Sequence, residues 1–145
     1  MSDYPDTRDA LYELIDGRTF AGRKAVAYYR ITVDNQGRPA YLTMGPDEAT
    51  VLLYTVGGTQ GYIDRVDRAT VEVYAPGTSA VEVAEAIAAE IAGDPALYGM
   101  GGKPHDLDAG YIDGISVEVT PHDVPFQSDL VNLARATYLV TSRPL

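Results

Sequence analysis

The side chains best suited to acid–base or metal chemistry lie in two copies of the tripeptide Pro-His-Asp. Imidazole and carboxylate groups bind metal ions and transfer protons near neutral pH. The two copies supply His105, Asp106, His122 and Asp123, which define one hypothesis, a small metal-dependent hydrolase. Proline and aspartate at this spacing are also common turn chemistry. We interpret both tripeptides as turns and keep the hydrolase as the competing hypothesis.

The glycine-rich stretch GMGGKP is the nearest approach to a phosphate-binding loop, and it departs from the required pattern twice. The pattern has glycine where this chain has Leu97, and serine or threonine where it has Pro104. The chain also lacks cysteine, which excludes disulfides, zinc–thiolate sites and cysteine nucleophiles. The sequence therefore predicts a protein that is not an enzyme and that uses no cofactor and no metal ion.

Two helices are expected to provide the scaffold. The first runs from Asp6 to Asp16, with acidic residues in its first turn, a short apolar stripe and Gly17 as its stop. The second spans residues 79–92 and begins at a capping pattern in which Ser79 and Thr78 compete for the cap. Its apolar row recurs every four residues beside a row of alanines, which suits close packing on a sheet. These rows contain Val83, Ile87, Ile91, Ala80, Ala84 and Ala88.

Alternating or β-branched segments predict the strands. We expect strands over 24–33, 49–58, 68–74, 115–120 and 132–143, with a turn and return strand over 34–44 and loops over 94–108 and 120–129. The last loop contains two prolines and should not belong to a central strand. The fold class predicted is α+β. It has a mostly antiparallel sheet of four or more strands, with two helices, the main one across one face. Residues 1–145 form one domain, with 21–45 as a hairpin extension.

Two similar words, GYIDRVDRATVEVY from Gly61 and GYIDGISVEVT from Gly110, raise the question of an internal duplication. A duplication would extend past the shared words. The first word continues into the alanine-rich helix, whereas the second continues into a proline-containing loop. We interpret the repeat as chance similarity between two strands of one sheet.

The charge is unevenly distributed over a chain whose net charge is −10. Residues 18–38 hold five basic side chains and one acidic side chain, hence +4, which leaves −14 for the rest. An acidic protein is a poor ligand for nucleic-acid phosphates. The basic segment is either a solvated hairpin face or a patch that docks on an acidic neighbour such as a second copy.

Eleven tyrosines, against two phenylalanines and no tryptophan, also favour interfaces. Several tyrosines could instead fill the core, so this signal leaves both interpretations open. The interface residues predicted from charge and tyrosine content are Arg23, Lys24, Arg30, Arg38, Tyr28 and Tyr41.

The order of predicted elements resembles the tail terminator proteins of long-tailed, siphovirus-type bacteriophages. Three stretches carry the resemblance: ATVLLYTVGG, then DRATVEVYAPGTSAVEVAEAIAAEIAG, then GISVEVTPHDVPFQSDLVNLARATYLVTSRP. It covers residues 49–143. That family has no invariant catalytic motif, and the segment around 21–45 departs from its shorter members.

The resemblance implies a hexameric, ring-forming virion protein at the tail–neck region, assembled in the host cytoplasm. Such a ring caps the tail tube, stops its polymerisation and joins the head-side connector. Its partners are therefore further copies of itself, the major tail tube protein and a connector or stopper protein, with no membrane. DNA passes the channel without specific binding, and an acidic wall would repel its phosphates. Another neck or tail-completion protein of the virion is the nearest alternative.

Overall fold

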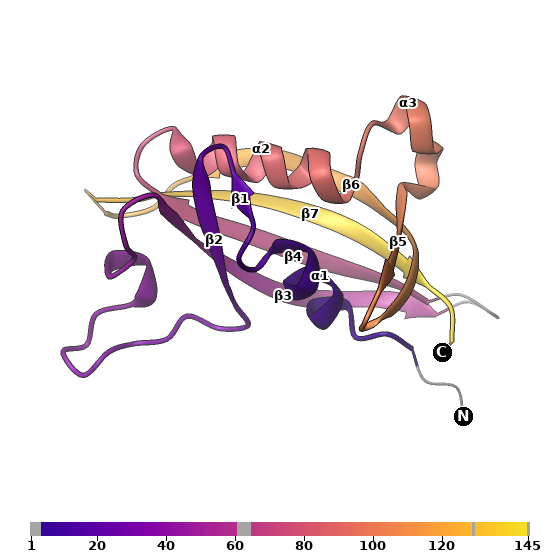
Figure 1. Ribbon diagram of the computed structural model, residues 1–145, viewed down its shortest axis with the longest axis horizontal. Helices are drawn as coiled ribbons and strands as arrows, with labels where there is room; N and C mark the ends of the chain where they lie inside the picture. The colour runs from indigo at the N-terminus through magenta and orange to yellow at the C-terminus, as the bar shows by residue number, and fades with distance from the viewer. Residues whose placement is uncertain (1–3, 61–64, 129, 145) are drawn as a thin grey trace.

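The computed structural model describes residues 4–60, 65–128 and 130–144, and it consists of one curved sheet with helices packed against it (Figure 1). The helical elements are α1 (Thr7–Ile15), η1 (Ala40–Leu42), α2 (Ser79–Ile91), α3 (Pro95–Tyr98) and η2 (Gly99–Gly101). The strands are β1 (Thr19–Phe20), β2 (Arg23–Tyr28), β3 (Glu48–Gln60), β4 (Arg65–Ala75), β5 (Lys103–Leu107), β6 (Gly110–Val124) and β7 (Asn132–Ser142). The predicted α+β class with a mostly antiparallel sheet is confirmed.

The seven strands lie in the order β1-β2-β3-β4-β7-β6-β5. Every neighbouring pair is antiparallel except β2 and β3, which run parallel and pair from Lys24–Glu48 to Tyr28–Leu52. A parallel pair needs a long connection between its strands, because the chain must return to the same end of the sheet. Residues 29–47 form that connection, and we call them the arm.

The two faces of the sheet differ in what covers them. Both helices contribute to one buried apolar cluster with alternate residues of the strands, so they lie on the same face. This cluster includes Leu11, Val51, Val71, Ile87 and Tyr138. The other face, which we call the open face, carries the residues between them, and among the described residues no α-helix packs across it. It includes Leu52, Tyr54, Arg68, Thr70, Glu72, Tyr74, Arg135, Thr137 and Leu139.

The helix predictions agree closely with the structure. Asp6 caps α1 by accepting hydrogen bonds from the backbone N–H groups of Arg8 and Asp9. The predicted apolar residues Leu11, Leu14 and Ile15 are buried. Thr78, rather than Ser79, occupies the cap position of α2.

In α2 the predicted contact row is fully buried, and it packs across β4, β7 and β6. Val83, Ile87 and Ile91 form this row, which an alanine row flanks. Gly93 follows the helix with a φ of +69°, and a Cβ there would lie 2.5 Å from the ring of Tyr98. Glycine is therefore required at this stop for both reasons.

The predicted hairpin over 21–45 is wrong. The first strand ends at Tyr28 instead of continuing to residue 33, and a short 3₁₀ turn, η1, stands where the return strand was expected. Two reasons are evident. β3 already occupies the edge of β2 at which a return strand would pair, and Pro39 lacks the N–H group that such a strand would need. In the described part of the chain, one antiparallel bridge between Val33 and Pro39 is all that remains of the hairpin.

The two predicted loops are partly strands. Residues 94–108 contain α3, η2 and β5, so His105 lies in a strand. β6 continues through the predicted loop as far as Val124, which includes Pro121. The proline rule still holds there, because β5 pairs with β6 only as far as Ile115, and Pro121 lies in a stretch with one neighbouring strand.

The glycine-rich stretch is explained by close packing of backbones. Gly102 has a φ of +81°, and a Cβ on it would lie 1.9 Å from the carbonyl oxygen of Ile115. A Cβ on Gly114 would lie equally close, at 1.9 Å, to the carbonyl oxygen of Gly101. These glycines let η2 approach β6 directly, which is a structural role rather than phosphate binding.

The two similar words occupy β4 and β6, which flank β7 on opposite sides. The first GYID and Tyr62 lie outside the described residues. Strand β3 continues past the predicted stop at Gly57-Gly58 to Gln60. Among the described residues no helix is both long and apolar enough to cross a lipid bilayer.

Candidate assembly interface

The arm is fastened to the body of the molecule at its base and near its end. At the base, the hydroxyl of Tyr29 donates to a carboxylate oxygen of Asp9 in α1, and its ring meets that of Tyr12 edge-on at 5.6 Å. The guanidinium of Arg8 lies 5.3 Å from the same ring. Burial, together with the Asp9 carboxylate, raises the pKa of Tyr29. The base of the arm is therefore packed on α1.

Near the other end of the arm, three aromatic rings join it to the open face. Tyr41 of η1 stacks on Tyr74 of β4 with ring centroids 4.7 Å apart. Phe126, from the segment between β6 and β7, meets both rings edge-on at 5.3 and 5.4 Å. Each such pair adds about 0.5–1.5 kcal/mol beyond the area it buries. The predicted interface residue Tyr41 therefore holds the arm against Phe126 and the sheet.

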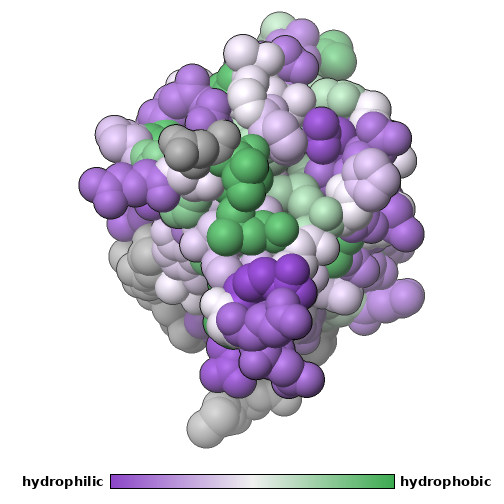
Figure 2. Space-filling view, turned by 90° about the vertical axis from the view of Figure 1, so that its left-hand side faces the viewer, coloured by the Kyte–Doolittle hydropathy of each residue, from purple (hydrophilic) through white to green (hydrophobic). Residues whose placement is uncertain are grey.

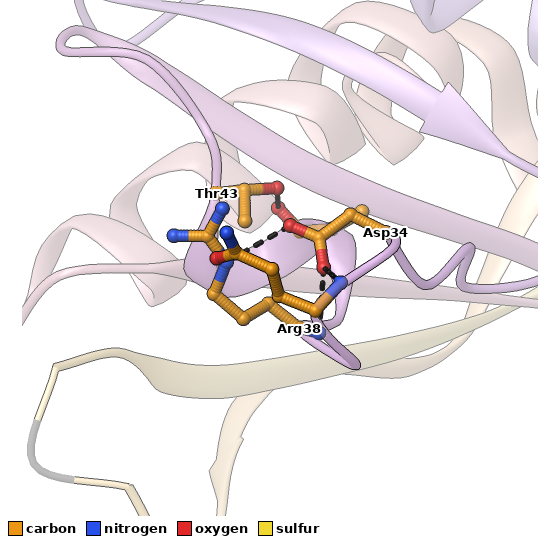
Figure 3. A network of polar contacts seen from close by, with 5 residues as sticks. Asp34, Arg38 and Thr43 are labelled. Carbon is orange, nitrogen blue, oxygen red and sulfur yellow. Dashed lines mark hydrogen bonds and ion pairs between the residues drawn. The ribbon is translucent and has the colours of Figure 1, made fainter.

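The middle of the arm is a tight polar turn around Asp34 and Arg38 (Figure 3). One carboxylate oxygen of Asp34 accepts from the backbone N–H groups of Gln36 and Arg38, and the other accepts from the Arg38 guanidinium at 2.9 Å. The backbone hydrogen bond from Arg38 is the main reason why the pKa of Asp34 is lowered. The charge of Arg38 is thus matched within its own turn.

The four predicted cations differ in whether their charged groups already have a partner. Arg23 donates from its guanidinium to the Glu48 carbonyl oxygen at 2.9 Å, so part of its hydrogen-bonding capacity is used internally. Lys24 and Arg30 are exposed. Within the described residues, neither forms an ion pair. Of the four cations predicted to contact a partner, Lys24 and Arg30 are therefore the two whose charged groups remain available.

The last predicted interface residue, Tyr28, ends β2 and pairs in register with Leu52 of β3. It is half-buried on the open face. Tyr28 directly precedes the arm, which contains Arg30 and Tyr41, whereas Arg23 and Lys24 lie at the start of β2.

The four residues of the hydrolase hypothesis do not converge. His105 pairs with Ile112, which in turn pairs with Ser142, whereas His122 pairs with Arg135. Those two β7 residues are seven positions apart, which is about 23 Å at a strand rise of about 3.3 Å per residue. No cluster of three or more metal-binding side chains occurs among the residues that the structure describes.

Each histidine instead has a local backbone partner. His105 Nε2 lies 2.7 Å from the carbonyl oxygen of Ile91, so this nitrogen carries the proton and ties β5 to the end of α2. His122 Nδ1 lies 2.8 Å from the carbonyl oxygen of Thr120. Both contacts are structural, and both lie in strands rather than in the predicted turns.

The open face carries two ion pairs that span the central strands. Arg135 of β7 donates to Glu72 of β4 at 2.5 and 2.7 Å, and Glu72 is only 5% exposed. Arg68 of β4 donates to both oxygens of Glu118 in β6 at 2.6 and 3.0 Å. The pKa of each arginine is raised, first by its hydrogen bond to the glutamate. These charges are neutralised on the face itself, so they do not attract a charged partner.

Sequence reasoning missed an exposed apolar surface at the end of the molecule that carries the arm. Val33 and Leu42 of the arm are exposed, and so is Leu130, with 68% of its surface accessible. Figure 2 looks onto this end and shows apolar side chains gathered near its middle, with polar ones around them. We call the arm together with residues 125–128, 130 and 131 the arm end.

A second apolar surface lies beside α3. A groove of about 300 Å³ is lined there mainly by small and apolar residues. They include Ala92, Gly93, Pro95, Gly99, Gly102 and Val117. Leu97 projects from α3 next to this groove and is 77% exposed. The only sequence signal for the groove was the glycine-rich stretch that borders it.

Neither a scan against protein-family models nor a search of curated proteins gives a match to this chain.

Proposed function

We propose that this chain is a structural virion protein, a ring-forming tail terminator that caps the tail tube, stops its polymerisation and joins it to the head-side connector. The observation that carries the proposal is the arm end. This exposed apolar surface lies beside Arg30, which forms no ion pair with any described residue, in a chain whose net charge is −10. Exposed apolar surface of this kind marks a site that another protein covers. The order of predicted elements and the α+β class also fit the family that the sequence resembles.

The charges of the molecule suit contact between unlike surfaces of neighbouring copies. A ring of identical subunits needs a heterologous interface, in which one surface meets a different surface of the next copy. Lys24 and Arg30 are free to meet an acidic surface, and much of the remaining chain is acidic. An acidic ring would also let DNA pass its channel without binding it, because like charges repel.

The direct test is negative-stain microscopy of the purified protein, alone and with tail-tube protein. We expect rings in the first sample, and capped tubes that no longer elongate in the second. Tubes that grow to the same length with and without the protein would contradict the terminator role. Rings that form but leave tube growth unchanged would favour the alternative, another neck or tail-completion protein.

The role of charge is tested with the double variant Lys24→Glu/Arg30→Glu. Exposed charges act mainly on the rate of association. We expect slower assembly at about 50 mM salt and a much smaller difference at about 500 mM, where the screening length falls from roughly 14 to 4 Å. Arg38→Glu is not suitable for this test, because it would remove the hydrogen bond from Arg38 to Asp34 that holds the turn. Equal rates at both salt concentrations would show that the two cations are merely solvated.

The hydrolase alternative predicts a different result for the pair His105→Ala/His122→Ala. A hydrolase that used these residues would lose metal binding and turnover while assembly continued. We expect unchanged ring and tube-capping behaviour, apart from lower stability where β5 loses its bond to Ile91.

A further inference from the structure

The arm end and the α3 groove have complementary shapes. Leu130, Val33 and Leu42 project from one end as exposed apolar side chains. The groove beside α3 is a hollow of about 300 Å³ with an apolar lining. Interface cores combine projecting apolar anchors with pockets that receive them.

The two surfaces are also complementary in charge. Arg30 of the arm is exposed, and within the described residues it forms no ion pair. At the other surface, Asp94 caps the start of α3 and is exposed, whereas Glu90 in the last turn of α2 already meets Arg18 at 3.9 Å. Asp94 accepts a hydrogen bond from the backbone N–H of Ala96, and a carboxylate so bonded still has free lone pairs. Opposite charges at the rim steer and orient two docking surfaces.

Their placement permits repeated contact between copies. Figure 1 shows the arm and α3 toward opposite ends of the long axis of the molecule. One copy therefore cannot bring its own arm end to its own groove, but it can offer each surface to a different neighbour. Head-to-tail contacts of this kind close into a ring or continue as a filament.

We infer that the arm end of one copy docks into the α3 groove of a second copy of this chain. Leu130 and the apolar arm residues enter the groove beside Leu97, and Arg30 faces Asp94 at its rim. This inference rests on the proposed ring assembly and names the two surfaces that build it.

The test uses one aspartate substitution on each surface of the full chain. Leu130→Asp disables the arm end, and Leu97→Asp disables the rim of the groove. Both residues are largely exposed in the single chain, so the fold should survive. Tyr111→Asp is the matched control, because Tyr111 is 48% exposed and lies at the start of β6, paired with Asp106 of β5 and outside both surfaces. Circular dichroism confirms folding, and sedimentation velocity measures assembly.

We expect each leucine variant to associate at least about tenfold more weakly than the unchanged protein, as for central interface residues. The control should assemble normally. An equimolar mixture of the two leucine variants should give a heterodimer and nothing larger. In that mixture, the intact arm end of Leu97→Asp meets the intact groove of Leu130→Asp, and the remaining two surfaces are disabled.

The possible failures separate this inference from the proposed function. If the unchanged protein forms rings and both leucine variants do too, the inference is wrong while the ring proposal stands. If Leu130→Asp forms rings but no longer caps tubes, the arm end binds the tube protein instead, which also overturns the inference. A mixture that restores complete rings would contradict a head-to-tail contact. If the unchanged protein is a monomer both alone and with tube protein, the proposed function fails.

Discussion

Strands β4 and β6 lie on either side of β7, and both contain the sequence Val-Glu-Val, yet their surroundings differ. β4 pairs with β7 from Arg65 to Ala75 without a register shift, and β3 covers its other edge. β6 pairs with β7 through three register shifts, and no described strand pairs with the outer edge of its stretch from Ser116 to Val124. The sequence Val-Glu-Val therefore occurs once in a central strand, β4, and once in a partly exposed strand, β6.

The contribution of each shared residue to the stability of the fold depends on these surroundings. Val71 and Val73 are buried beneath the helices, whereas Val117 and Val119 are 36% and 42% exposed. The side chain of Glu72 is 7% exposed in its ion pair, whereas that of Glu118 is 27% exposed. Local sequence therefore determines that both segments are strands, and the neighbouring strands determine how much each residue contributes.

The largest loss of stability is expected when a side chain of α2 is removed from the core that α2 shares with β4 and β6. Ile87 of α2 is fully buried, and α2 packs across β4, β7 and β6 together. Ile87→Ala should lower the free energy of unfolding by about 2–5 kcal/mol, because it removes buried methylenes and leaves a cavity. Urea denaturation followed by circular dichroism measures this. A loss below about 1 kcal/mol would mean that the assigned contact face of α2 is wrong.

The next largest effect should come from the glutamate of the central strand. Glu72→Gln removes the negative charge that Arg135 meets at 2.5–2.7 Å, and leaves a poorer acceptor in a nearly buried position. We expect a loss of about 2–3 kcal/mol in the free energy of unfolding, since hydrogen bonds to charged groups contribute more than neutral ones. The double variant Glu72→Gln/Arg135→Gln should lose less than the sum of the single variants. Additive losses would mean that the pair is not coupled in the folded protein.

Periodic segments could be predicted from the sequence, and contacts between distant segments could not. The apolar rows of α1 and α2 are local patterns, so Val83, Ile87 and Ile91 were placed correctly in the core. The return strand over 34–44 was predicted from local turn chemistry. That prediction was wrong because β3 pairs with the edge of β2. This pairing joins distant segments, so no local sequence pattern indicates it.

The candidate interface was predicted only in part, for the same reason. The net charge of residues 18–38 pointed to the arm. Whether a cation is free depends on partners such as Asp34 for Arg38, and only the folded chain shows these. Leu130 and the groove beside α3 were missed altogether. A single exposed leucine carries no periodic signal, and the groove is built from residues of several distant elements.

The residue after each Val-Glu-Val gives a third contrast, since it is Tyr74 in β4 and Thr120 in β6. Burial, followed by the nearby charge of Glu72, raises the pKa of Tyr74 to about 12. The folded state thus holds this proton more tightly than the unfolded state. The associated stability is complete below pH of about 10 and is lost as the pH rises from about 10 to about 12.

At pH 11 the loss due to Tyr74 should be about 1 kcal/mol, after allowance for solvent screening. It is measured as the difference between the unchanged protein and Tyr74→Phe in urea denaturation at pH 8 and pH 11. Other tyrosines with raised pKa values, among them Tyr54 and Tyr138, contribute equally to both proteins and cancel. A Tyr74→Phe variant with the same pH dependence as the unchanged protein would contradict the assignment.

The smallest effect is expected at Glu118, the counterpart of Glu72 in the exposed strand. Its ion pair with Arg68 has good two-pronged geometry, but 48% of the arginine side chain and 27% of the glutamate side chain are accessible to water. Exposed pairs contribute about 0.2–1 kcal/mol, because water competes for both charges and salt screens them. Glu118→Gln should therefore cost less than about 1 kcal/mol, and the cost should shrink further at high salt. The comparison of β4 with β6 would fail if Glu118→Gln were as destabilising as Glu72→Gln, since the outer edge of β6 would then have to be covered rather than open.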